Sequence, residues 1–151
     1  MRCRVISCVL PVVAIAAARL GVALAGTAVV SCEMPTSLSA GATLLARPGA
    51  FVQWWQEVEA CSGVTGDLSR VSWFQVPCEA GENGFPCDVT PEGLCAGEWI
   101  GPHTIELGGP NHFFPGGYAD DEWTVKHEML HDLLQTPEHP VQFQNCHLLL
   151  R

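Results

Sequence analysis

Residues 120–135 read DDEWTVKHEMLHDLLQ, a segment whose polar and apolar positions follow the period of an amphipathic helix. Asp120 or Asp121 can cap its first turn, where carboxylates also favour the positive end of the helix dipole. Pro137 cannot continue a helix, so the element ends just before it. We therefore predict a helix that begins at Asp120 and ends at Gln135.

His127 and His131 lie four residues apart on this predicted helix. Four steps of about 100° return nearly to the same face, so both imidazoles point in one direction and can bind one zinc ion. Glu128 lies one step round from His127, where its carboxylate reaches a zinc-bound water without binding the metal itself. Zinc lowers the pKa of such a water to near 7, and Glu128 is the predicted general base that accepts its proton.

A catalytic zinc site needs a third protein ligand, for which His139 is the preferred residue. Pro137 stops the helix and Pro140 favours an extended conformation at His139, so the chain turns and returns this imidazole toward the metal. Asp132 lies about 100° further round the helix than His131 and is expected to point away. The other candidates for the third ligand are Glu138, His147, His103 and His112.

These residues resemble the zincin peptidases, and among them the metzincins, which carry the motif HExxHxxGxxH. The resemblance covers about 20 residues and implies that His127, His131 and His139 bind zinc, with Glu128 as the base. It also implies a backing helix, strands and an edge strand before the active-site helix.

The match to the metzincin motif is incomplete at three points. His139 follows His131 by eight residues, where the metzincin motif has six. Leu134 occupies the position of the turn glycine. No methionine-containing turn follows His139, and Met129 lies inside the predicted helix, so the sequence resembles a small, divergent zincin.

The rest of the chain predicts an α+β domain in which a backing helix and the active-site helix pack on a small twisted sheet stabilised by disulfides. Phe51, Trp54, Trp55 and Val58 share the inner face of the backing helix. The predicted elements are a helix over Arg47–Cys61, strands over Arg70–Val76 and Glu98–Leu107, and loops over Cys78–Gly97 and Gly108–Gly117.

Two further segments have competing interpretations. Thr104–Leu107 is either an edge strand that binds an extended peptide by backbone pairing or an ordinary structural strand. Tyr118, the only tyrosine, can stabilise an oxyanion or pack within a loop, and the packing role is preferred.

Residues 1–31 are expected to be an export signal, followed by a linker over 32–46 and the metallopeptidase-like domain over 47–151. Arg2 and Arg4 form a basic start, and Pro11 and Arg19 interrupt the apolar stretches that follow. No apolar run therefore reaches the ~18 residues that a membrane span needs.

Two cleavage patterns compete at the end of the export signal. Ala23–Ala25 fits ordinary signal cleavage, whereas Val29–Cys32 resembles a lipobox that would make Cys32 a lipid anchor. Both patterns predict a location outside the cytoplasm, as a secreted protein or a membrane-anchored lipoprotein.

Six cysteines follow residue 31, and their even number predicts three disulfides in an oxidising compartment, or two with one cysteine left over if Cys32 is lipidated. A disulfide at Cys146 would hold the segment around His139. The six are Cys32, Cys61, Cys78, Cys87, Cys95 and Cys146.

The predicted mature part carries four basic and 16 acidic residues, a net charge of −12. Such a surface excludes nucleic acid as a partner and leaves the membrane only through a lipid anchor. We expect a zinc-dependent metallopeptidase that hydrolyses peptides or proteins outside the cytoplasm. The alternatives are a non-catalytic extracellular zinc-binding or interaction module and a hydrolase of non-peptide amides.

Overall fold

Four strands form a mixed sheet in the order β1-β2-β6-β5, within the residues that the computed structural model describes (37–87, 90 and 93–149). β2 runs parallel to β6, whereas β1 pairs with β2 and β5 pairs with β6 in antiparallel orientation. Two further strands form a small separate sheet. The strands are β1 (Thr43–Leu44), β2 (Ser72–Val76), β3 (Phe85–Pro86), β4 (Leu94–Cys95), β5 (Gly97–Gly101) and β6 (Thr104–Gly108).

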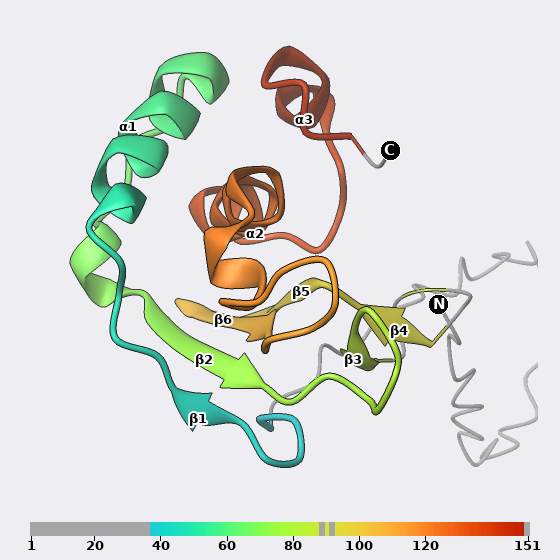
Figure 1. Cartoon of the computed structure of the whole chain (residues 1–151). Helices are drawn as coiled ribbons and strands as arrows, with labels where there is room; N and C mark the ends of the chain where they lie inside the picture. The colour runs from blue at the N-terminus through green and yellow to red at the C-terminus, as the bar shows by residue number, and fades with distance from the viewer. Residues whose placement is uncertain (1–36, 88–89, 91–92, 150–151) are drawn as a thin grey trace, which may run out of the picture. The chain divides into compact units, whose positions relative to one another are not determined.

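Three α-helices lie on one side of the four-stranded sheet: α1 (Ala50–Ser62), α2 (Glu122–Leu134) and α3 (Val141–Asn145) (Figure 1). Trp73, Ile105 and Leu107 point from the sheet into the core beneath them. The α+β class and the packing of helices on a small sheet are therefore confirmed. The short 3-10 helices Leu68–Arg70 and Tyr118–Asp120 precede β2 and α2.

α1 is the predicted backing helix, and its apolar face is buried as expected. Phe51, Trp55 and Val58 are buried along it, and the Phe51 ring lies 4.5 Å from the Trp73 ring, measured between centroids. The helix begins at Ala50, three residues later than predicted. It ends at Gly63, whose φ of 72° is readily adopted by glycine, with its N–H donating to the Glu59 carbonyl.

The single strand predicted over Glu98–Leu107 is wrong, because this segment forms the hairpin of β5 and β6. His103 adopts a φ of 60° between the two strands and reverses the chain direction. A register shift lies between Trp99 and Gly101. The polar and apolar residues do not alternate between Trp99 and Thr104, and Gly101-Pro102 is a turn signal that the single-strand prediction overlooked.

β6 lies between β2 and β5, so the prediction of an edge strand at Thr104–Leu107 is wrong and its structural alternative holds. Within the described sheet, β5 is the edge strand beside β6. The expected linker over 32–46 also contains β1, which adds the opposite edge. Ser39, just before β1, donates from its N–H and hydroxyl to the buried Glu106 carboxylate.

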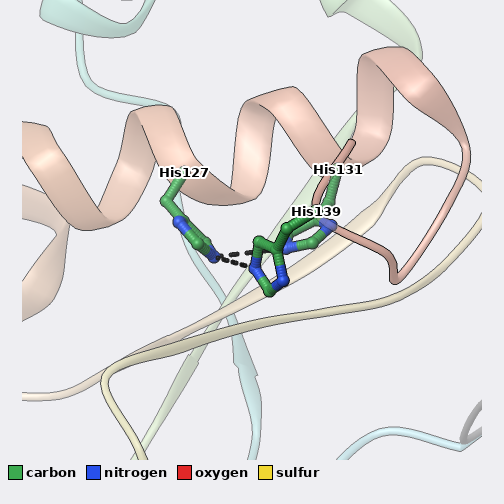
Figure 2. A group of neighbouring side chains, drawn as sticks. All are labelled: His127, His131 and His139. Carbon is green, nitrogen blue, oxygen red and sulfur yellow. Dashed lines mark hydrogen bonds between the residues drawn. The ribbon is translucent and has the colours of Figure 1, made fainter. Parts of the chain in front are cut away.

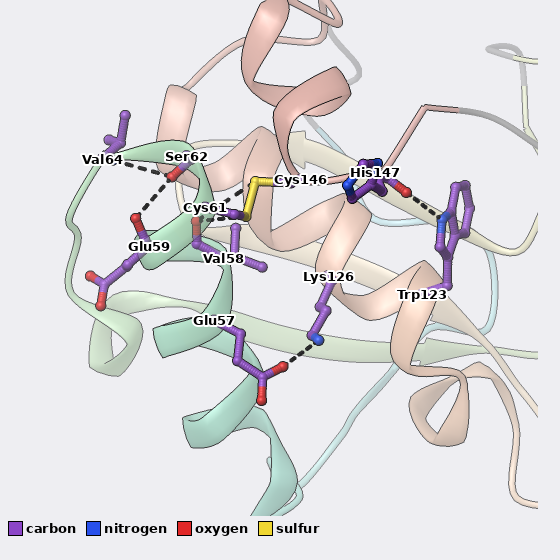
Figure 3. The surroundings of a disulfide bond; sticks show 10 residues. All are labelled: Glu57, Val58, Glu59, Cys61, Ser62, Val64, Trp123, Lys126, Cys146 and His147. Atoms are coloured by element: carbon purple, nitrogen blue, oxygen red, sulfur yellow. Dashed lines mark hydrogen bonds and ion pairs between the residues drawn. A yellow bond between two sulfur atoms is a disulfide. The ribbon is translucent and has the colours of Figure 1, made fainter.

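The predicted loop over Cys78–Gly97 includes β3 and β4, joined by the Cys87–Cys95 disulfide. A second disulfide links Cys61 at the end of α1 to Cys146 just after α3 (Figure 3). Cys78 has no disulfide partner among the described residues. Cys32 lies outside them, and so does the whole predicted export signal.

The two disulfides indicate an oxidising environment outside the cytoplasm. Among the described residues, no helix is long and apolar enough to cross a bilayer.

Candidate metal centre

His127, His131 and His139 converge on one point beside α2 (Figure 2). The first two project from neighbouring turns of the helix, and the third comes from the segment that follows it. The Nε2 atom of His127 lies 3.2 Å from the Nε2 atoms of both His131 and His139. The structure thus brings together the three residues predicted from spacing.

The Nδ1 atoms of the two helical histidines each donate a hydrogen bond to a carbonyl oxygen. His127 donates to Leu148 at 2.7 Å, and His131 donates to Thr136 at 2.8 Å. A carbonyl only accepts, so each Nδ1 carries its proton. This arrangement orients both rings from behind and leaves each Nε2 facing the shared point.

Burial keeps these two imidazoles neutral. It lowers the pKa of His127 to about 4 and, with the neighbouring His127, the pKa of His131 to about 3. Two neutral rings with protonated Nδ1 atoms direct two lone pairs at each other across 3.2 Å. Such a contact has no hydrogen between the nitrogens and is favourable only when a cation lies among them.

The donor set fits a metal ion. Nitrogens at about 2.0–2.1 Å from one tetrahedral zinc lie roughly 3.4 Å apart, close to the spacing seen here. All three ligand atoms lie within 4.8 Å of one another. Burial also lowers the pKa of His139, so all three rings favour the neutral form that binds metal.

The return of His139 depends on the end of α2. Gln135 takes a φ of 50° at the helix end, and the Thr136 N–H donates to the His131 carbonyl. The Thr136 hydroxyl then accepts from the Glu138 N–H at 3.2 Å. These local hydrogen bonds shape the turn after α2 that brings His139 back to the two helical histidines, as predicted.

Glu128 is buried between α2 and the edge strand β5. Burial, together with the nearby Glu98 carboxylate, raises its pKa to about 8, while the Trp99 N–H donates to it and opposes the rise. Gly97 allows this approach, because a Cβ there would lie 2.9 Å from the Glu128 Cγ. The carboxylate is not part of the three-histidine group of ligand atoms found among the described residues.

The alternative third ligands take other roles or positions. His103 Nδ1 pairs with the Asp132 carboxylate at 3.1 Å, and the His112 ring contacts the neighbouring Phe113 ring. Glu138 is exposed beside His139. The backbone carbonyl of His147 accepts from the Trp123 indole.

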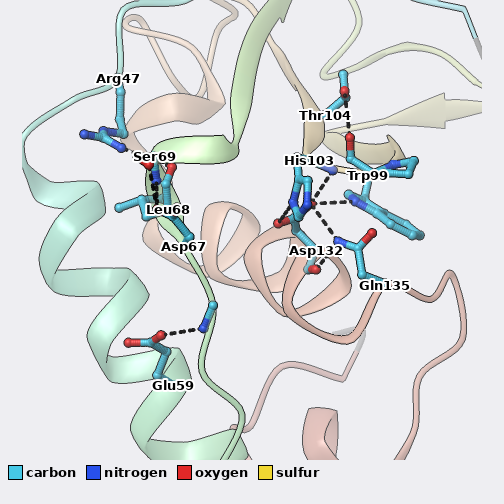
Figure 4. Close-up of polar contacts among 12 residues, drawn as sticks. Arg47, Glu59, Asp67, Leu68, Ser69, Trp99, His103, Thr104, Asp132 and Gln135 are labelled. Carbon is cyan, nitrogen blue, oxygen red and sulfur yellow. Dashed lines mark hydrogen bonds and ion pairs between the residues drawn. The ribbon is translucent and has the colours of Figure 1, made fainter.

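Asp132 lies outside the three-histidine group, as predicted, and is buried against the β5–β6 hairpin (Figure 4). Its carboxylate accepts from the indole of Trp99 at 3.0 Å and from the His103 N–H at 2.8 Å. The Trp99 ring stacks on His131 with an interplanar angle of 10°. Asp132 therefore fixes the edge strand against the three-histidine group.

Two other side chains differ in their relation to the site. The Tyr118 hydroxyl donates to the Asn83 carbonyl, in agreement with the preferred packing role. Phe143 on α3 contacts the rings of all three histidines, a role that was not predicted from the sequence. An apolar residue in a segment too short to show a helical period gives no sequence signal of that role.

Comparisons with protein-family models, with curated proteins and with solved structures found no match to this chain.

Proposed function

We propose that this protein is a zinc-dependent hydrolase of peptide bonds that works outside the cytoplasm. The observation that carries the proposal is the convergence of three imidazole Nε2 atoms, two of them neutral with their protons held on Nδ1. Three neutral nitrogen ligands match a catalytic zinc site, in which the remaining position is open. When bound, zinc would polarise a carbonyl and acidify a water molecule.

Glu128 is the proposed general base. In its ionised form the carboxylate accepts a proton from the attacking water and later passes it to the leaving amine. Its position next to the helical ligands, buried and with the Trp99 N–H as a partner, holds the carboxylate in one place. The pKa of about 8 in the metal-free protein fits a group that exchanges protons near neutrality.

The proposed substrate is an extended peptide or protein segment that lies along β5. This strand is an edge of the described sheet, next to Glu128. Its Trp99 N–H already donates to the Glu128 carboxylate, so a peptide would pair with the outer backbone groups that remain. The antiparallel edge strand, the HExxH helix and the third histidine together support a zincin-like arrangement.

Metal content tests the first half of the proposal. We expect about one zinc per purified chain, lost in His127→Ala and in His139→Ala. His112→Ala is the matched control, because that imidazole is exposed and lies outside the three-histidine group. An unchanged zinc content in His139→Ala would show that His139 is not the third ligand.

Cleavage of a peptide library tests the second half. We expect Glu128→Gln to abolish hydrolysis while zinc stays bound, and Glu138→Gln, an exposed carboxylate two residues beyond Thr136, to keep activity. If zinc binds but the wild type and Glu128→Gln act alike on every peptide, the domain is a zinc-binding module. Hydrolysis confined to non-peptide amides would change the substrate class alone.

A further inference from the structure

A single aromatic ring, that of Phe143, packs against all three histidines of the proposed metal centre. Phe143 is fully buried on α3, and its centroid lies 5.0, 4.6 and 4.7 Å from the ring centroids of His127, His131 and His139. A ring in contact with three imidazoles at once limits the tilt of each. Removing part of it would leave all three histidines with space to rotate.

His127 also takes its orientation from the same end of the chain. Its Nδ1 proton goes to the carbonyl of Leu148, which is 21 residues away, whereas the acceptor for His131 is only five residues away. The Trp123 ring, 5.1 Å from His127, donates its indole N–H to the His147 carbonyl. The segment 141–149, here called the C-terminal tail, therefore contacts the proposed metal centre in two ways. The Phe143 ring packs on the three imidazoles, and the Leu148 carbonyl accepts from His127 Nδ1.

A disulfide holds the C-terminal tail in place. Cys146 lies between Phe143 and Leu148 in sequence and is bonded to Cys61 at the end of α1 (Figure 3). α3 has only five residues, too few for a helix that is stable by itself. The Leu148 N–H donates to the Phe143 carbonyl at 2.8 Å. This bond links the ring that packs on the histidines to the residue whose carbonyl accepts from His127.

We propose that Phe143 is a positioning residue for the three histidines, and that the Cys61–Cys146 disulfide sets metal affinity by holding the C-terminal tail. This inference rests on the proposed metal binding. A dithiol reductant would donate two electrons and two protons to this disulfide, giving two thiols and the oxidised reductant. The released tail then no longer fixes the Leu148 carbonyl behind His127.

Zinc affinity, measured by competition with a chromophoric chelator, tests the role of Phe143. Loss of an outer partner of a metal-binding histidine weakens affinity on the order of 10–100-fold, and we expect such a loss in Phe143→Leu. Phe85→Leu is the matched control, because Phe85 is equally buried but belongs to the separate cluster with Val76 and Cys95. Equal affinity in Phe143→Leu and the wild type would overturn the positioning role.

The two disulfides offer a second matched pair. We expect the double variant Cys61→Ser/Cys146→Ser to bind zinc on the order of tenfold or more weakly, and Cys87→Ser/Cys95→Ser to bind as the wild type does. Circular dichroism confirms that each variant is folded. Equal loss in both double variants, or in neither, would contradict a specific link between the tail and the site.

A metal-free readout separates this inference from the proposed function. Nitrogen-15 spectra of the histidine rings report which nitrogen carries the proton. At pH 7 we expect His127 to hold it on Nδ1 in the wild type and to become a mixture of tautomers in Cys61→Ser/Cys146→Ser. Failure of the wild type to bind zinc would reject the proposed function, whereas an unchanged tautomer would reject the role of the tail.

Discussion

His127 and His131 are neutral over most of the pH range in which proteins work, because their burial lowers their pKa values to about 4 and about 3. Protons therefore compete little with a metal at these nitrogens. We expect zinc affinity to fall less than about fivefold from pH 8 to pH 6, where three histidines with ordinary pKa values would lose roughly 50–100-fold. Calorimetric titration at the two pH values checks this, and a loss of the larger size would contradict it.

Glu128 makes the stability of the metal-free protein depend on pH. Its pKa rises from 4.5 to about 8 on folding, so its stabilising contribution is complete below about pH 4.5 and is lost as the pH rises to about 8. Glu128→Gln has no such loss. We therefore expect the variant to gain about 2–4 kcal/mol over the wild type between pH 5 and pH 8.

Urea unfolding of chelator-treated protein at both pH values measures that gain. The stability contributed by His127 and His131 falls as the pH drops below 6.5, because their pKa values are lowered on folding. That effect is common to the wild type and Glu128→Gln, so the difference between them isolates Glu128. A difference independent of pH would show that this carboxyl titrates normally.

Helical spacing was enough to predict which way His127, Glu128 and His131 lie relative to one another, because one rigid element carries all three. The return of His139 could also be predicted, because Pro137 and Pro140 lie on either side of it. Phe143 was not, since its contact depends on how α3 packs under α2. The role of the Leu148 carbonyl could not be predicted either, because every residue has a backbone carbonyl whatever its side chain.

At the scale of elements, Asp132 joins α2 to the β5–β6 hairpin. Asp132→Asn places an amide donor against the Trp99 indole or the His103 N–H, and hydrogen bonds to charged groups contribute about 1.5–3 kcal/mol. We expect a loss of about 2 kcal/mol with faster amide exchange in the hairpin. Asp67→Asn, which alters an exposed local cap, should leave hairpin exchange unchanged.

The contact between β5 and α2 depends on Gly97. A Cβ there would lie 2.9 Å from both the Glu128 Cγ and the Thr124 Cγ2, so Gly97→Ala must push the helix from the strand. Overpacking of this kind costs about 1–3 kcal/mol, and chemical denaturation measures it. Gly49→Ala meets nothing within 4 Å and should be neutral or slightly stabilising.

Helices were easier to predict than strands in this chain. α1 and α2 have clear apolar faces and terminal signals, and their boundaries differ from prediction by no more than a few residues. β1 was not predicted, because its position follows from pairing with β2, a distant partner. The hairpin turn at His103 is local, and the Gly101-Pro102 signal for it was overlooked. α3 is too short for its periodicity to be recognised.

At the scale of the whole molecule, a metal that binds only the folded form stabilises the fold. Free zinc at 100 times its dissociation constant adds about 2.7 kcal/mol, which raises the melting temperature by about 10 °C in a domain of this size. We expect this shift in the wild type. Differential scanning calorimetry should find no shift in His139→Ala, and an equal shift there would mean that zinc binds elsewhere.

The disulfide from Cys61 to Cys146 spans 85 positions, and the three histidines lie within the loop that it closes. Ribosomes release a chain from its N-terminus onward, so a nascent polypeptide has its HExxH segment well before residue 148 emerges. If the tail positions His127 as proposed, such a partial chain has no finished centre. On the proposed function, such a hydrolase would stay latent during biosynthesis and mature only after an oxidase had closed this loop of 85 positions.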